Sequence, residues 1–363
     1  MTRIGPARIG LGVWALIIAL IALVVLTFLP TPYVIQRPGP VYDTLGTAAS
    51  ADGEEVPLIE IDGAETYDTA GSLNLTTVQV VGNRERTPSW FELALAWTDA
   101  SRAVVPIESV FPEGVTTEER DERNAVLMVD SQHEATAAAL HQLGYDTGAA
   151  VEVVAALEGS PAEGLLEEGD VVEEIDGVAV TSASALRAAI QDSEGDPVTL
   201  SVRKDGEVEE IEITPVKDES GSDTWLIGIT LATDYDFPFD VHIQLDNVGG
   251  PSAGMMFALG IIDELTPGEL TGGNDIAGTG TIDATGAVGP IGGIRQKLYG
   301  ARDAGADYFL APEANCGEVV GHVPDGLTVI STSTLEDSLD ALEVIADRGD
   351  VAALPTCAAD SAA

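Results

Sequence analysis

Residues 236–348 alternate between short strand-like runs and helix-like runs, and this alternation most limits what the chain can fold into. Strand patterns appear in DVHIQLDNV, IAGTGTID, ADYFLAP and LTVISTS. Helical patterns follow GGPSAG and recur in GGIRQKLYGARDAG and TLEDSLDALEVIA. Such an order is typical of a layer structure in which helices cover a sheet. We therefore expect an α/β domain over 218–350, followed by a tail over 351–363.

The chain has 363 residues, more than one hydrophobic core usually serves, so we expect an α+β protein of several domains. Within 31–129, VPLIEIDG and GSLNLTTVQVVG alternate apolar and polar residues, which predicts strands over 55–82. WFELALAWTDASRAVV predicts an amphipathic helix, and TTEERDERNAVLMVD fits a surface helix or a connection between lobes.

The N-terminal region is uncharged and mostly apolar from Ile9 to Leu29. About 21 residues at about 1.5 Å each match a hydrocarbon core of about 30 Å, so the pattern predicts a transmembrane helix over 9–30. Arg3 and Arg8 precede it, which places a tail of residues 1–8 in the cytoplasm and the rest outside the cell membrane. The alternative is a cleaved signal peptide, but the run is long for one and no A-x-A-like site follows.

The composition is strongly acidic, with 61 Asp and Glu against 16 Lys and Arg and a net charge of -45. This balance argues against nucleic acids and anionic membrane surfaces as partners. The histidines and cysteines have no metal-ligand spacing, so we expect neither a metal nor a cofactor. Outside the cytoplasm disulfides persist, which predicts a bridge between Cys316 and Cys357. The alternative is two free thiols.

Residues 130–217 form a separate unit by pattern, with a helix, short strands, a second helix led by a serine, and a hairpin. The segment VAALEGSPAEGLLEEGDVVEEIDGVAV resembles a bacterial PDZ domain, a fold that adds a peptide as an extra strand at its sheet edge. The resemblance implies a groove between the strand 149–154 and the helix 183–190, with Leu186 and Ile190 facing it. LGYDTG, at the place of the carboxylate-binding loop, departs from the usual loop pattern. The alternative is a small sandwich that binds nothing.

One serine stands in the stretch DNVGGPSAGMMFALG, directly before an apolar run. Gly249 and Gly250 permit a tight turn, and Pro251 suits the first position of a helix. Ser252 is then expected in the first helical turn, where free N–H groups of the Gly249 and Gly250 turn could stabilise an oxyanion. An ordinary helix start is the alternative. A Walker A phosphate loop is excluded because the chain has no Gly-Lys dipeptide.

A serine nucleophile needs a base, and lysine occurs only at positions 204, 217 and 297. Ile294, Lys297, Leu298 and Ala301 follow the spacing i, i+3, i+4, i+7, which places Lys297 on the apolar face of a helix. Burial lowers the pKa of a lysine, as a general base requires. The alternative is a lysine at the edge of a core with its amine in water. His242, the histidine nearest in sequence to the serine, fits one side of a strand better than the role of base.

GGPSAGMMFALGIID and IAGTGTIDATGAVGPIGGIRQKLYGARDAGADYFLAP together resemble the proteolytic domain of Lon-type serine peptidases. The resemblance implies that Ser252 attacks a peptide carbonyl, that Lys297 is its base, and that Thr279 orients the lysine. Two acidic positions of many Lon enzymes are Gly249 and Thr281 here, and the Lon ATPase module is absent from the sequence.

The whole arrangement resembles the membrane-anchored, PDZ-containing Lon-like peptidases of Gram-positive bacteria. It implies ATP-independent cleavage of flexible or unfolded proteins, with the PDZ domain recruiting or gating substrates, and a homo-oligomer such as a hexamer. LNLTTVQV resembles an early strand of the proteolytic fold, which suggests that the PDZ unit is inserted into it. The rival hypothesis is a pseudopeptidase that only docks peptides. A Ser-Lys signal peptidase lacks support, since its serine would lie close to the membrane segment.

Overall fold

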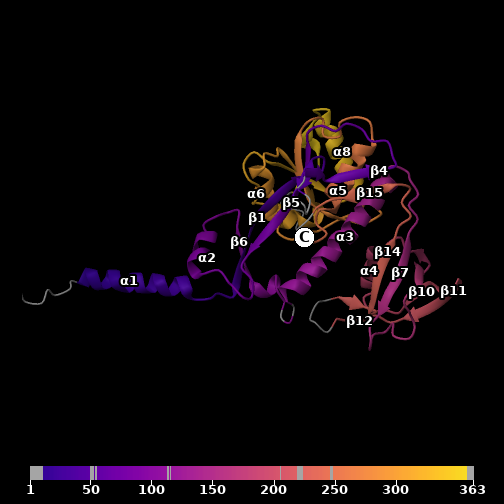
Figure 1. Cartoon of the computed structure of the whole chain (residues 1–363), viewed down its shortest axis with the longest axis horizontal. Helices are drawn as coiled ribbons and strands as arrows, with labels where there is room; N and C mark the ends of the chain where they lie inside the picture. The colour runs from indigo at the N-terminus through magenta and orange to yellow at the C-terminus, as the bar shows by residue number, and fades with distance from the viewer. Residues whose placement is uncertain are drawn as a thin grey trace, which may run out of the picture.

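The computed structural model shows two sheet-containing units connected through a long helix, with an N-terminal helix that projects from them (Figure 1). The structure describes residues 11–49, 53, 55–112, 114, 116–204, 206–218, 224–245 and 248–357.

The larger unit is built on a six-stranded sheet whose order is β20-β19-β16-β5-β1-β6. Strands β5, β16, β19 and β20 are parallel, and β1 is antiparallel to both β5 and β6. Segments from both ends of the sequence therefore form one sheet. The bounds are β1 Tyr33–Asp43, β5 Ser72–Val81, β6 Ala103–Pro106, β16 Asp275–Gly278, β19 Tyr308–Pro312 and β20 Thr328–Thr332.

Helices cover both faces of this sheet. Ile276 of β16 packs into a core with α3, α5 and α8, whereas its neighbour Ala277 packs into a second core with α6 and α7. This alternation is that of a strand buried on both sides, which explains the continuous apolar runs in the sequence. The bounds are α3 Thr117–Gln142, α5 Gly254–Leu265, α6 Ile294–Asp303, α7 Cys316–Val319 and α8 Leu335–Ala346.

The smaller unit has its own sheet, of order β11-β10-β8-β7-β14 with β9 paired to β8, and its own core around Leu186 and Leu200. Helix α4, Ala183–Asp192, covers this sheet. Ser182 caps its N-terminus, since the Ser182 side chain accepts a hydrogen bond from the N–H of Ala185. The strands are β7 Ala150–Ala156, β8 Val171–Ile175, β9 Val178–Ala179, β10 Val198–Lys204, β11 Glu207–Ile213 and β14 Ile229–Asp234.

Short elements complete the fold. The two-stranded pairs are β2 Thr47–Ala49 with β3 Glu55–Pro57, β4 Ile59–Asp62 with β15 Asp240–Ile243, β12 Val216–Lys217 with β13 Trp225–Leu226, and β17 Thr281–Ile282 with β18 Val288–Gly289. The short helices are α2 Trp90–Ala96, η1 Ile107–Ser109, η2 Glu313–Asn315 and η3 Val351–Ala353.

The predicted transmembrane helix over 9–30 is wrong. The helix in this region is α1, Leu11–Phe28, and residues 9 and 10 lie outside the described part of the chain. Across the described residues, no helix combines the length and the apolar character needed to cross a membrane. With 18 residues at about 1.5 Å each, α1 is about 27 Å long, shorter than a hydrocarbon core of about 30 Å.

Two further expectations differ from the structure. The expected boundary at residue 130 falls inside α3, and the second half of this helix packs in the core of the larger unit through Ala135 and Ala139. The helix expected over 90–105 ends at Ala96, and 103–106 form strand β6 beside β1. In both regions contacts with distant parts of the chain, rather than the local sequence pattern, determine where the element ends.

The C-terminal segment returns to the larger unit. Cys357 is bonded to Cys316 of α7 in a disulfide, and Ser331 of β20 donates its N–H to the carbonyl of Pro355. The residues expected to form a tail from 351 onward are therefore fastened to the domain as far as 357.

Candidate active site

Ser252 lies in a turn two residues before α5 begins at Gly254, rather than in the first helical turn. Its backbone is held by the segment that follows β16. The carbonyl of Ser252 accepts hydrogen bonds from the Thr279 hydroxyl at 2.8 Å and from the N–H of Gly280 at 3.0 Å. The serine is thus fixed at the carboxyl end of a central parallel strand.

Lys297 reaches the same place from the opposite face of the sheet. It lies in α6, and with Ile294, Leu298 and Ala301 it forms the buried face of that helix, as the spacing predicted, while Arg295 is exposed. The residue is 2% exposed. The alternative interpretation required the amine to lie in bulk water, and the burial of Lys297 contradicts it.

The amine of Lys297 lies between two hydroxyl groups. Its Nζ is 2.8 Å from Ser252 Oγ and 2.8 Å from Thr279 Oγ1. Because the Thr279 hydroxyl uses its one O–H to donate a hydrogen bond to the Ser252 carbonyl, its oxygen accepts a hydrogen bond from the amine. Thr279 therefore sets the direction of the amine. The nitrogen lone pair of the neutral amine stays available to the Ser252 hydroxyl.

The electrostatics of this arrangement favour a neutral amine. Burial lowers the pKa of Lys297 from 10.5 to about 7. The network around the amine consists of hydroxyl groups, and among the described residues no carboxylate forms an ion pair with Lys297. Desolvation is thus not offset by a nearby negative charge. Near neutral pH the amine can accept a proton.

The glycine turn differs from its expected role. Gly250 adopts a left-handed φ of 90°, but its N–H donates to the carbonyl of Asn124 in α3 at 2.9 Å. At Gly249 a side chain would come within 2.7 Å of the Asn124 Cβ. The two glycines therefore let the turn pack against α3. Within the described part of the chain, the backbone N–H groups of Ser252 and Ala253 are free of hydrogen bonds.

The residues predicted to line the PDZ groove do not line it. Leu186 and Ile190 are 0% and 4% exposed and pack in the core of the smaller unit. The predicted groove strand, β7, is paired on both sides, with β8 and with β14. The edge strand beside α4 is β14, which comes from a part of the sequence that pattern analysis assigned to the next domain.

Sequence reasoning missed the contribution of α3. Ser131 donates a hydrogen bond from its hydroxyl to the carbonyl of Pro251 at 3.0 Å, next to Ser252. Glu134 is 9% exposed and accepts hydrogen bonds from the N–H of Ala284 and from the Ser184 hydroxyl of α4, so it joins the two units. An uninterrupted helical pattern from 117 to 142 was the available signal. Across the described residues, no group of three or more His, Cys, Asp or Glu is placed to hold a metal.

Comparison with known protein families identifies two regions. Residues 231–344 match the Lon protease (S16) C-terminal proteolytic domain, and residues 152–204 match a PDZ domain. The first match begins in β14 and includes Ser252, Thr279 and Lys297.

Curated relatives agree with this assignment. The chain is 32% identical over 109 residues to Lon protease 2 of Bacillus subtilis, an alignment that covers 29% of this chain and 19% of that protein. It is 37% identical over 107 residues to Lon protease 2 of Herpetosiphon aurantiacus, covering 28% and 13%. The chain thus spans less than a fifth of the length of these relatives.

Among solved structures, the PDZ domain of the SdrC-like protein Lin2157 from Listeria innocua is 31% identical, with a TM-score of 0.21, and covers 23% of this chain and 92% of that one. The Lon family match covers the segment that holds Ser252 and the buried Lys297. The chain therefore contains a region similar to the Lon protease C-terminal proteolytic domain and a region similar to a PDZ domain.

Proposed function

We propose that the chain is an ATP-independent serine endopeptidase with a Ser252–Lys297 dyad, and that it cleaves flexible or unfolded proteins. The observation that carries the proposal is the 2.8 Å separation between Lys297 Nζ and Ser252 Oγ, combined with burial that brings the lysine pKa to about 7. A nucleophile and a base within hydrogen-bond distance, with a third group orienting the base, are the requirements for acyl transfer.

The chemical steps follow from this geometry. Lys297 takes the proton of Ser252 as Oγ bonds to the peptide carbonyl carbon, and it then gives that proton to the leaving amine as the C–N bond breaks. A water molecule next attacks the acyl-enzyme, with Lys297 taking its proton and returning one to Ser252. In this proposal the carbonyl oxygen, negative in each tetrahedral intermediate, accepts hydrogen bonds from the N–H groups of Ser252 and Ala253, near the start of α5.

The substrate class follows from what the chain can do without external energy. The sequence has no Gly-Lys dipeptide and therefore no Walker A motif, so we propose hydrolysis without ATP by this chain. A folded protein would not yield an extended segment to Ser252. Loops, tails and unfolded chains would, and the PDZ domain offers the edge of β14 as a strand on which such segments can be held.

The test compares the full chain with three variants on an unfolded protein and on a fluorogenic peptide. Ser252→Ala and Lys297→Met are expected to lose cleavage, on the order of a thousandfold or more. Lys204→Met is the matched control, because Lys204 is a lysine bonded to Leu165 and Asp170 in the PDZ domain, remote in sequence from the site. Equal cleavage by Ser252→Ala and wild type would overturn the proposal, and binding of peptides without any cleavage would establish the rival scaffold.

A further inference from the structure

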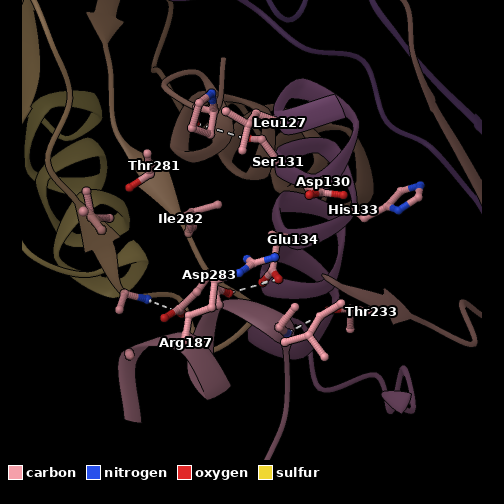
Figure 2. Close-up of a pocket in the computed structure, with 18 of the residues that line it drawn as sticks. Leu127, Asp130, Ser131, His133, Glu134, Arg187, Thr233, Thr281, Ile282 and Asp283 are labelled. Atoms are coloured by element: carbon pink, nitrogen blue, oxygen red, sulfur yellow. Dashed lines mark hydrogen bonds between the residues drawn. The ribbon is translucent and has the colours of Figure 1, made fainter. Parts of the chain in front are cut away.

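A pocket of about 420 Å³ lies between the two domains, enclosed by α3, α4, β14 and the β17–β18 pair (Figure 2). Its proteolytic wall includes Pro251, which is bonded to Ser252, together with Ile282 and Val288. Its PDZ wall includes Ala188 of α4 and Leu231 of β14. One continuous space therefore reaches from the residue next to the nucleophile to the edge of the PDZ sheet.

The PDZ wall of the pocket is shaped to accept an extended chain. Strand β14 is the last strand of its sheet, so one of its edges has no strand partner among the described residues. Helix α4 lies along this edge. At the start of α4 the N–H of Ala183 donates to the Thr233 side chain of β14, and at its end the Gln191 side chain is hydrogen-bonded to Trp225 of β13. An unpaired edge beside a helix is the surface that peptides use in strand addition.

We propose that this pocket is the passage through which one extended substrate segment continues from the Ser252 site onto the edge of β14, so that cleavage and PDZ binding act on the same stretch of polypeptide. The inference rests on the proposed peptidase function. It deepens that function by giving the substrate a minimum length. Helix α4 has ten residues and is about 15 Å long, a distance that about five extended residues cover.

The charges of the pocket define the side chains that suit it. Asp130, Glu134 and Asp283 line it, against a single arginine, Arg187, and His133. Burial raises the pKa of Glu134, and two hydrogen bonds from Ala284 and Ser184 act in the opposite direction. In Figure 2, Asp130 and His133 lie on the α3 side and Arg187 on the α4 side. Together with the net charge of -45, this lining favours basic or neutral substrate segments over acidic ones.

The test measures kcat/KM on peptides that share one cleavage site and are extended stepwise on either side. We expect kcat/KM to rise when the extension on one side reaches about five residues. Ala188→Trp, which places an indole in the pocket on an exposed position of α4, is expected to abolish this gain in kcat/KM. Ala185→Trp is the matched control, because Ala185 lines a different hollow, beside β8 and β9.

The outcomes separate the two proposals. If Ala188→Trp leaves the length dependence intact, or slows short and long peptides equally, the passage is refuted while the peptidase assignment stands. If wild type cleaves no peptide at all, the proposed function itself fails. Asp130→Lys provides an independent measurement, because Asp130 is exposed and lines the passage. It should reverse the preference for a lysine over a glutamate in the extension, by up to about fivefold at low salt.

Discussion

The pH dependence of cleavage tests the buried lysine most directly. With a pKa of about 7, Lys297 is about one tenth neutral at pH 6 and about nine tenths neutral at pH 8. If the neutral amine is the base, kcat/KM should rise about ninefold over this interval and then level off. A lysine with the ordinary pKa of 10.5 would give a rise of about a hundredfold over the same interval, with no plateau below pH 10.

The assay is initial-rate cleavage of a short fluorogenic peptide from pH 5.5 to 9.5 at constant ionic strength, with circular dichroism at each pH to exclude unfolding. Thr279→Val removes the hydroxyl that accepts a hydrogen bond from the amine and donates one to the Ser252 carbonyl. We expect a lower plateau in this variant, whereas the Lys204→Met profile should match wild type. A log rate that still climbs with unit slope at pH 9 would refute the argument that burial sets the pKa of the base.

Four other measurements follow from the structure. Lys297→Met should raise the free energy of unfolding by up to about 4 kcal/mol at pH 7 and by nothing above pH 10.5. The reason is that the buried lysine destabilises the folded chain only at pH values where the lysine of the unfolded chain is charged. Burial raises the pKa of Glu264 from 4.5 to about 7, so Glu264→Gln should raise the free energy of unfolding by up to about 3 kcal/mol at pH 8 and by little at pH 4.5. The partial exposure of Glu264 reduces this figure. Chemical denaturation at both pH values measures the change. Gly250→Ala, at φ 90°, should cost about 1 kcal/mol or more of stability and slow cleavage by shifting the serine turn, measured by thermal melting and kcat. Reduction of the Cys316–Cys357 disulfide should lower Tm, and a Tm unchanged by reductant would contradict the fastening of the C-terminal segment.

The burial of Lys297 and the turn at Ser252 could be predicted from the sequence because both depend on local patterns. The spacing of Ile294, Lys297, Leu298 and Ala301 defines one face of a helix, and the structure buries that face. Glycines before Ser252 indicated a tight turn at that point. The direction of the Thr279 hydroxyl bond to the Ser252 carbonyl, by contrast, depends on how β16 and α5 pack, and no local pattern records it.

The organisation of the domains could be predicted only in part. Strand β14 belongs to the PDZ sheet although it follows the hairpin and a break in the pattern, because its partner β7 lies more than seventy residues earlier in the chain. Leu186 and Ile190 have the apolar character of groove residues, but the same character suits a core. In the structure both residues pack in the core of the smaller unit. For α1, the apolar pattern extended beyond the helix that the structure describes.

The smaller unit is inserted in the chain between α3 and β15 of the larger unit. Helix α3 leads into the PDZ domain, and the chain returns through β14 and β15, which pairs with β4 of the larger unit. The same helix holds the serine turn, through the carbonyl of Asn124 and the hydroxyl of Ser131. It also contacts α4 through Glu134. Helix α3 therefore contacts both the Ser252 turn and α4, so the geometry at Ser252 and the position of α4 depend on the same helix.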